Sequence, residues 1–532
     1  MTQNSVIVLG IDSLDIRLVR TWAAQGHLPN FAELLNKSRW GLVENPKGVE
    51  AGSVWPTFTT GYRPDHTGLF NACYRIDPST YKLRVIDIEE RSVPPIWVKL
   101  SEANKRVAVV DVPYELLEEE LNGVQVTDWL PHVFIRYPGP STYPANLAQE
   151  LVNKHGGNPF GGPNRCPTND VTVDTLEEIV DFRDKLLDRI ERKHAYCREL
   201  LEEERWDYFT AVFHEAHEIG HMCWHVHDKG HEKFDESIAT EIGDPILDVY
   251  KAIDHAIGDL ARMAWDDASV LVYLSHGIGP QQTGTGIFDD ILVKLHETYS
   301  KANNGAPAAK GGNPRMLSRL AKIYRRLVPK SIRAGAFKTS AAKKLYGQVA
   351  QERIRNRAFF ACNPNHATGG IRINLKGREE YGVIEPGTEY EQLCKQLASD
   401  IQDIVNLDTG EPIVKSAVQI NELYDGPRTS YLPDVLLEWN KSGPINRVES
   451  PKTGIVERQK FSTRTGDHVQ KHGAFLAFGP GITPGELDSP VKAFDFAPTI
   501  AHILGVGGAY QGTPIQEICT SSQHADTVAE IG

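Results

Sequence analysis

SVIVLGID, residues 5–12, opens the chain with β-branched and apolar residues and ends in Gly and Asp. Similar runs recur at 106–113 (RVAVVDVP), 208–215 (YFTAVFHE) and 269–277 (SVLVYLSHG). Nearly continuous apolar strands of this kind are typical of parallel sheets that are covered on both faces. Amphipathic stretches such as DPILDVYKAIDHAIGDLARMAWD, residues 244–266, separate the runs. The sequence therefore predicts an α/β protein with a doubly wound, mostly parallel sheet and helices on both faces.

Residues of types that commonly bind metal ions, Asp and His, follow three of these predicted strands. Asp12 ends the first run, a histidine-rich stretch begins at His214, and His276 follows the run at 269–274. In doubly wound folds, ligands bind at the carboxyl ends of the strands. We therefore expect these side chains to meet at one edge of the sheet.

Composition excludes several classes of protein. The 532 residues carry a net charge of −13, so we expect no sequence-specific nucleic-acid binding. No apolar run approaches the roughly 18 residues of a membrane helix, and the N-terminus lacks the basic region of a signal peptide. The seven cysteines are scattered without a CxxC pair, which favours reduced thiols and a cytoplasmic protein.

Residues 281–360 depart from the strand–helix pattern. They are rich in Gly, Ala, Lys and Arg and include RMLSRLAKIYRRLVPKSIRAGAFKTSAAKKL at 315–345. We interpret this segment as a basic, partly helical insertion in a core made of 1–280 and 361–532. Three roles remain open: a solvated lid, a lid that guides an anionic substrate, and a patch that contacts a membrane surface or an acidic partner.

The densest chemical signal is FHEAHEIGHMCWHVH, residues 213–227. On a helix, His217 and His221 lie one turn apart on the same face and can share a metal ion. The same residues also match the HExxH pattern of zinc peptidases, with Glu218 as the base. That alternative leaves Asp12 and His276 without a role.

Three further segments identify a family. They are SVWPTFTTGYRPDHTGLFN at 53–71, TGDHVQKHGAFLAFGPGI at 465–482 and KAFDFAPTIAHILGV at 492–506. In this order, together with the strand ends above, they resemble the alkaline phosphatase superfamily and most closely its type I phosphodiesterase/nucleotide pyrophosphatase branch. The resemblance implies an alkaline-phosphatase-like fold and a metal-dependent hydrolase of phosphate esters, most similar to a phosphodiesterase.

The resemblance also implies a site with two divalent metal ions, zinc or another metal such as manganese. One ion is expected at His217, His221 and His468. The other is expected at Asp12, the turn at 51–53, and the pair Ser275 and His276. Asn71 is expected to donate a hydrogen bond to a phosphoryl oxygen of a small anionic phosphate- or sulfate-ester substrate.

This chain departs from the family pattern at two positions. Ala51 stands where the nucleophile is expected, and Ser275 stands where an Asp ligand is expected. Ser53 is the nearest hydroxyl and is our predicted catalytic nucleophile, with Glu50 as a possible extra metal ligand. A metal-bound water and a non-catalytic site are the two alternatives. On the same fold, the chain is alternatively a relative that binds an anionic ligand or partner without turnover, or a phospho-group transferase or mutase.

Overall fold

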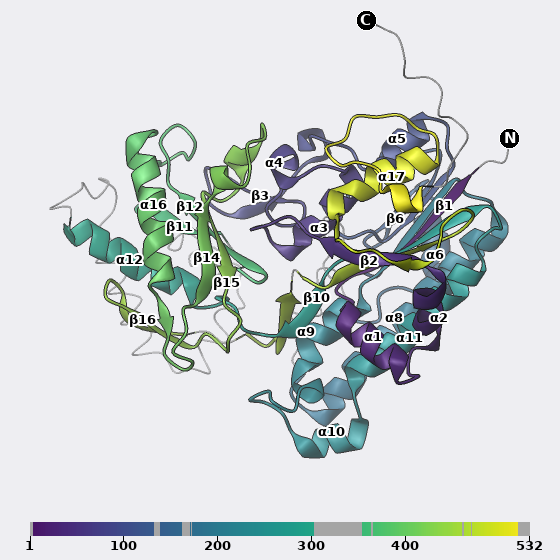
Figure 1. Ribbon diagram of the computed structural model, residues 1–532, viewed down its shortest axis with the longest axis horizontal. Helices are drawn as coiled ribbons and strands as arrows, with labels where there is room; N and C mark the ends of the chain where they lie inside the picture. The colour runs from purple at the N-terminus through teal and green to yellow at the C-terminus, as the bar shows by residue number, and fades with distance from the viewer. Residues whose placement is uncertain are drawn as a thin grey trace, which may run out of the picture.

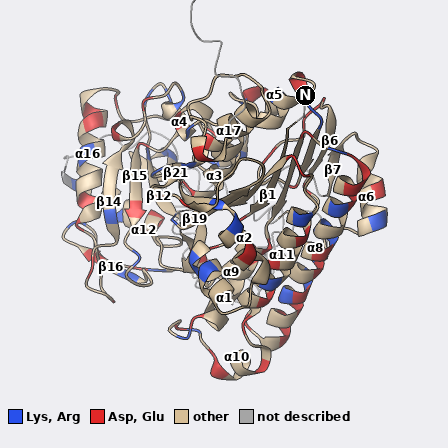
Figure 2. Ribbon diagram, turned by 45° about the vertical axis from the view of Figure 1, so that its right-hand side comes forward, with Lys and Arg blue, Asp and Glu red and all other residues tan. Residues whose placement is uncertain are grey.

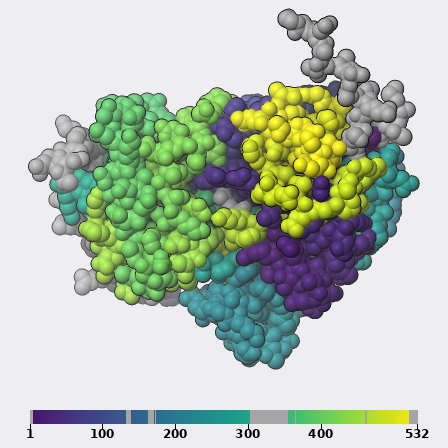
Figure 3. Space-filling model, in the orientation of Figure 1, coloured from purple at the N-terminus to yellow at the C-terminus, as the bar shows by residue number. Residues whose placement is uncertain are grey.

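The computed structural model describes residues 4–131, 139–161, 171, 173–302, 354–362, 365–459, 462–469 and 471–519 (Figure 1). Two lobes lie side by side. The larger lobe is built on one wide sheet, and the smaller lobe has a four-stranded sheet of its own. Figure 3 shows the small lobe in green beside the large lobe in purple, teal and yellow.

The wide sheet has a parallel centre. Its strands run in the order β20-β2-β19-β9-β1-β8-β5-β6-β7, with β21 also paired to β2. Strand β1 pairs in parallel with both β8 and β9, whereas β19 is antiparallel to β9. This confirms the predicted mostly parallel sheet. The strands are β1 Ser5–Ile11, β2 Arg39–Glu44, β5 Val107–Val110, β6 Gly123–Thr127, β7 Ser141–Tyr143, β8 Tyr208–Phe213, β9 Ala268–Leu274, β19 Gly473–Phe478, β20 Gly485–Glu486 and β21 Val491–Lys492.

Helices cover both faces of this sheet, as two separate hydrophobic clusters demonstrate. Residues of β1, β8 and β9 alternate between the two clusters, as successive side chains of a strand must. The helices of one face are α1 Ile16–Ala24, α2 Pro29–Lys37, α6 Leu147–His155, α8 Leu176–Glu203, α9 Glu215–His227, α10 Glu236–Ile242 and α11 Pro245–Arg262. Those of the other face are α3 Val54–Thr60, α5 Ile96–Glu102 and α17 Phe496–Ile503.

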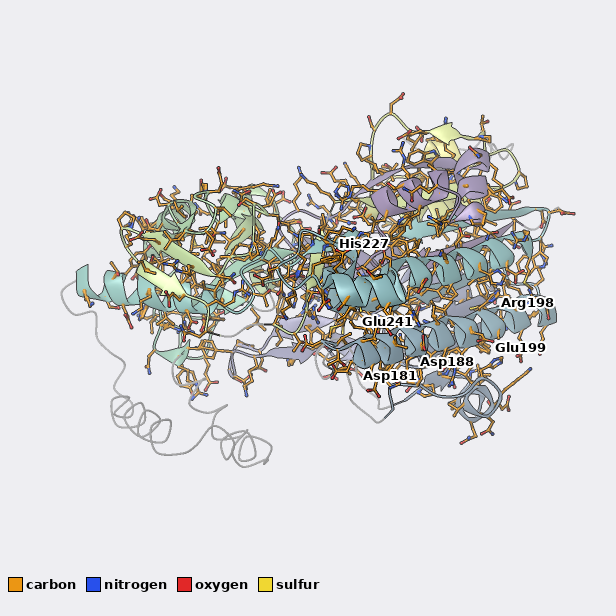
Figure 4. All side chains as sticks on the ribbon, turned by 90° about the horizontal axis from the view of Figure 1, so that it is seen from below. Asp181, Asp188, Arg198, Glu199, His227 and Glu241 are labelled. Atoms are coloured by element: carbon orange, nitrogen blue, oxygen red, sulfur yellow. The ribbon has the colours of Figure 1, made fainter. Side chains whose placement is uncertain are left out.

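The long helix α8 carries charged residues on its outer side. Figure 2 shows alternating acidic and basic segments along it, and Figure 4 shows Asp181, Asp188, Arg198 and Glu199 spaced over its length. Its inner side holds two charged residues that are fully buried, Arg189 and Lys193. Charges on an outer helix face are ordinary, but buried charges require partners.

The small lobe forms around its own hydrophobic core. That core joins helix α12 and Phe359, which belong to the predicted insertion 281–360, to residues between 371 and 456. The small lobe therefore extends across the predicted boundary at 361. Most of the basic stretch, residues 303–353, lies outside the described residues. The elements of this lobe are α12 Phe288–Ala302, β11 Phe359–Cys362, β12 Thr368–Ile373, α16 Thr388–Gln402, β13 Val405–Asn406, β14 Val414–Gln419, β15 Val435–Trp439, β16 Arg447–Ser450 and β17 Gly454–Glu457.

A two-stranded antiparallel ribbon lies where the lobes meet. It pairs β10, Gly277–Pro280, with β18, Gly466–Val469. In Figure 1 the ribbon lies between α9 of the large lobe and the sheet of the small lobe. A short helix and hairpin, α4 Pro64–Thr67 with β3 Tyr74–Ile76 and β4 Leu83–Val85, complete the described large lobe.

No helix among the described residues has the length and apolar character that a membrane crossing requires. The six cysteines described are free thiols, five of them buried.

Candidate metal centre

The register of the sheet brings three strand ends to one edge. Ile11 of β1 pairs with Phe213 of β8 and with Leu274 of β9. The next residues, Asp12, His214 and Ser275, therefore leave the sheet at the same level. All three are buried.

Three histidines converge beside this edge. His217 and His221 lie one turn apart on α9, and His468 lies on β18. The Nε2 atom of His217 is 2.7 Å from that of His468, and the Nε2 atom of His221 is 2.9 Å from each of the other two. In the part of the chain that the structure describes, they are the one group of three or more His, Cys, Asp or Glu residues arranged to hold a metal ion.

Two glycines make this convergence sterically possible. A Cβ atom on Gly466 would lie 2.1 Å from the backbone carbonyl oxygen of Gly220, and one on Gly220 would lie 2.4 Å from the side chain of Ile278. The backbones of α9 and β18 approach each other closely because Gly466 has no side chain, and Gly220 leaves room for Ile278 of β10. That approach places His468 against the α9 histidines.

The chemistry of the three nitrogens fits a divalent cation. The Nδ1 atom of His221 donates to the Gly466 carbonyl oxygen at 2.7 Å, so its Nε2 presents a lone pair. Burial, reinforced by the positive charge of Arg464, lowers the pKa of His221 well below its usual value. Burial and the neighbouring His221 do the same for His468. Neutral imidazoles are the form that binds zinc, so this set fits a zinc-type ion.

The second expected set of ligands is arranged differently. Asp12 Oδ1 accepts hydrogen bonds from Trp55 Nε1 at 2.8 Å and from Ser275 Oγ at 2.9 Å. His276 Nε2 lies 3.7 Å from the same oxygen, and His217 Nδ1 lies 3.8 Å from Asp12 Oδ2. Asp12, Ser275 and His276 are thus brought together, but Ser275 acts as a hydrogen-bond donor where a second anionic ligand is expected. One carboxylate and one imidazole fit a divalent ion poorly.

Ser13 is a neighbour of this set that sequence reasoning missed. Its Oγ lies 3.1 Å from Nδ1 of His276, and its backbone adopts a left-handed conformation with φ of 59°. A non-glycine residue with positive φ is uncommon outside Asn, Asp and His. The residues around Ser13 in the sequence carry no signal of this conformation.

The hydroxyl of Ser53, the predicted nucleophile, is hydrogen-bonded next to its own turn. Ser53 ends the short 3₁₀ turn Ala51–Ser53, and its Oγ donates to the backbone carbonyl oxygen of Leu69 at 3.0 Å. That bond directs the hydroxyl into the turn. Asn71 lies against the same turn, because a Cβ atom on Gly52 would meet its Oδ1 at 2.6 Å.

Two buried carboxylates join the lobes next to the metal centre. Glu50 accepts hydrogen bonds from the backbone N–H groups of His366 and Ala367, each at 3.0 Å, and burial raises its pKa to about 8. Asp467 accepts from Thr283 Oγ1 and lies 3.4 Å from Nδ1 of His366. Burial opposes the ionisation of Asp467, yet His366 and His468 hold its pKa well below the usual range.

Two cations flank the histidines, and sequence reasoning missed both. Lys441, just after β15, donates a hydrogen bond from Nζ to the backbone carbonyl oxygen of His468. An Nη1 atom of Arg464 lies 3.4 Å from Nε2 of His221 and 3.5 Å from Nε2 of His366. A single Lys or Arg in a loop has no sequence pattern that distinguishes it from a surface residue. Lys441 and Arg464 place positive charge next to the three histidines.

The peptidase alternative is not supported by the position of Glu218. Its Oε1 lies 2.6 Å from Nη1 of Arg189, and Glu215 lies 3.2 Å from Nη2 of the same guanidinium, with all three side chains fully buried. Burial raises the pKa of Glu218 to about 7, although Arg189 opposes the shift. Glu218 therefore packs against α8, where it pairs with Arg189 as a structural ion pair.

Comparison with known proteins gives a family match over most of the chain. The family model described as Type I phosphodiesterase / nucleotide pyrophosphatase matches residues 6–474. No curated protein matches the sequence significantly.

Among solved structures, murine ectonucleotide pyrophosphatase/phosphodiesterase 5 is 12% identical with a TM-score of 0.49, over 97% of this chain and 100% of that one. The human protein of the same name is 11% identical with a TM-score of 0.47, over 97% of this chain and 100% of that one. Phosphonoacetate hydrolase from Sinorhizobium meliloti 1021 is 12% identical with a TM-score of 0.46, over 93% and 94% of the two chains.

Proposed function

Because this chain belongs to the type I phosphodiesterase/nucleotide pyrophosphatase family of the alkaline phosphatase superfamily, we propose that it hydrolyses small phosphodiesters with the help of a divalent metal ion. The observation that carries the proposal is the convergence of three Nε2 atoms, within 2.9 Å of one another, at His217, His221 and His468. Zinc is the metal that this ligand set favours. A bound zinc ion would stabilise negative charge and lower the pKa of water at the site.

The chain's own residues supply binding and orientation. Asp467 accepts a hydrogen bond from the His468 backbone N–H at 2.8 Å and so fixes the strand that carries this histidine. Arg464, beside His221, is placed to bind a phosphoryl oxygen through its planar fork of donors. We propose that the Asn71 side-chain amide donates a further hydrogen bond from the turn at 51–53.

Water is the nucleophile in this proposal. Ala51 offers no hydroxyl, and the Ser53 hydroxyl is bound to the Leu69 carbonyl oxygen. His276 is buried beside Asp12 and burial lowers its pKa, so it is a neutral imidazole at neutral pH. Free thiols in the described part of the chain favour a reducing compartment, and we place the reaction in the cytoplasm.

The test is a substrate panel on zinc- or manganese-loaded protein. Hydrolysis of bis(p-nitrophenyl) phosphate should exceed that of p-nitrophenyl phosphate and p-nitrophenyl sulfate. The His468→Ala variant should lose the reaction, while His255→Ala, an exposed histidine on α11, should retain it. No turnover of any ester, in protein that holds its metal, would contradict the proposal.

The two alternatives from sequence predict other results. A relative without turnover would bind inorganic phosphate at this centre and hydrolyse none of the panel. A transferase would form product only when an acceptor alcohol is added. Ala51 and the donor role of Ser275 favour the first of these alternatives over the second.

A further inference from the structure

His366 is held where the two lobes meet. It lies between β11 and β12 of the small lobe, and its backbone N–H donates to Oε1 of Glu50, in the large lobe, at 3.0 Å. Its imidazole is mostly buried. The ring centroid lies 6.1 Å from that of His468 and 6.5 Å from that of His221. The small lobe thus places an imidazole beside the metal centre that does not belong to the group of three ligands.

The surroundings of Nδ1 determine which nitrogen of this ring carries the hydrogen. Nδ1 of His366 lies 3.1 Å from the hydroxyl oxygen of Thr285 and 3.4 Å from Oδ2 of Asp467. The Thr285 hydroxyl donates its own hydrogen to the backbone carbonyl oxygen of Asn365 at 3.0 Å. Both neighbours of Nδ1 therefore act as acceptors. In the neutral ring, Nδ1 carries the hydrogen and Nε2 has a lone pair.

The lone pair on Nε2 of His366 faces Arg464. The Nη1 atom of Arg464 lies 3.5 Å from this nitrogen and 3.4 Å from Nε2 of His221. A guanidinium group donates hydrogen bonds and never accepts them, so both imidazole nitrogens are acceptors toward it. The lone pair of His221 is the one that a zinc ion would take. His366 is therefore an acceptor that stays available to Arg464 next to the metal centre.

Arg464 needs such an acceptor because its side chain is long. It precedes β18, and holding a flexible side chain in one rotamer costs conformational entropy, which a hydrogen bond at its tip offsets. We propose that His366 is a positioning residue that directs the guanidinium group of Arg464 to the phosphoryl group of the substrate. Asp467 orients both His366 and His468, through its two carboxylate oxygens. This inference rests on the proposed function for the substrate and for the role of Arg464.

The experiment measures the binding of inorganic phosphate to zinc-loaded protein by calorimetry, together with the zinc content. Arg464→Ala should weaken phosphate binding at least about tenfold, the usual effect of losing a charged hydrogen bond. His366→Ala should weaken it about 2–10-fold, because the guanidinium group remains but loses a neutral acceptor. Both variants should keep the zinc content of the wild type, since neither side chain is one of the three ligands.

The double variant shows whether His366 acts through Arg464. When Arg464 is already replaced by alanine, His366→Ala should weaken phosphate binding no further, because the group that it positions is gone. Equal phosphate affinity in His366→Ala and wild type would overturn the inference. The same conclusion would follow from an undiminished effect of His366→Ala in the Arg464→Ala background, or from a loss of zinc in His366→Ala.

Two amide variants keep the test decisive if His366→Ala does not fold. The amide of His366→Gln reaches the position of Nε2, whereas that of His366→Asn reaches the position of Nδ1. The glutamine thus retains an acceptor for Arg464 and should recover phosphate affinity, while the asparagine should not. Equal affinity in the two variants would contradict the positioning role. The matched control is His296→Ala, a partly buried imidazole of α12 that packs on Phe359 and should leave phosphate binding unchanged.

The two proposals fail in different ways. Weaker phosphate binding in His366→Ala, in a protein that hydrolyses no ester, would refute the hydrolase and keep the positioning role of His366. Ester hydrolysis with equal phosphate affinity in wild type and His366→Ala would refute the positioning role alone. In an active enzyme, His366→Ala should lower kcat as well as raise KM, because the phosphoryl group gains charge in the transition state.

Discussion

The Nε2 atoms of His217 and His468 lie 2.7 Å apart although 251 positions separate the two residues in the chain. Two buried imidazoles at this distance, with His221 as the third, form a set of ring nitrogens that a cation can bind. The same arrangement determines which substitutions should remove the metal and which should leave it in place.

Replacing any of His217, His221 or His468 by alanine should remove the zinc ion. Two imidazoles hold zinc much more weakly than three, so the loss of activity should exceed the roughly 10–100-fold that an outer partner costs. Elemental analysis of protein purified without chelator gives the metal content, and His255→Ala is the control. Addition of zinc should raise the Tm of the wild type but not of the three variants.

Asp467→Asn should weaken zinc binding about 10–100-fold without abolishing it. The carboxylate accepts the His468 N–H and the Thr283 hydroxyl, and an amide at this position retains one oxygen for the two donors. Competition with a zinc chelator measures the affinity. An unchanged zinc affinity would show that Asp467 stabilises the lobe contact and does not position His468.

Ser53→Ala should keep its activity within about an order of magnitude of wild type. Its hydroxyl donates to the Leu69 carbonyl oxygen, so the expected cost is about 1 kcal/mol of stability. Removal of a true nucleophile costs far more, on the order of 10⁶-fold in a serine hydrolase. Such a loss, with the zinc content unchanged, would restore Ser53 as the nucleophile.

Arg189→Met should destabilise the protein by about 3–5 kcal/mol, because it leaves Glu215 and Glu218 buried without their cation. The control is Lys185→Met on the same helix. Its i,i+4 pair with Asp181 is exposed and should contribute only about 0.3–0.5 kcal/mol. Urea unfolding measures both variants.

Glu218→Gln separates the hydrolase from the peptidase alternative. The glutamine should lower stability, since it weakens the pair with Arg189, and should keep ester hydrolysis near the wild-type rate. A metallopeptidase would instead lose its general base and its turnover of peptide substrates. Assays with a phosphodiester and with casein distinguish the two.

Glu50 should make stability depend on pH. Burial raises its pKa from 4.5 to about 8, so the folded protein binds a proton that the unfolded chain has released. Its contribution is therefore complete below pH ~4.5 and is lost as the pH rises through about 8. The difference in Tm between wild type and Glu50→Gln, measured with chelator, should fall across this range and stay flat above it.

Sequence alone determined much of the fold and placed three histidines of the candidate metal centre. The apolar runs that end at Asp12 and Leu274 predicted parallel strands. A strand that is buried on both faces needs apolar side chains at nearly every position. The i,i+4 spacing of His217 and His221 fixed their common face, because helix geometry is local. His468 was assigned to the same metal ion from the resemblance of the segment 465–482 to the family pattern.

Only the tertiary structure decided the rest of the site. The direction of the Ser53 hydroxyl, the pairing of Glu218 with Arg189, and the position of Lys441 depend on contacts between segments far apart in the chain. No local pattern encodes such contacts, because each requires two backbones to approach at a set distance. The meeting of Lys441 with the carbonyl oxygen of His468 across the two lobes is the clearest case.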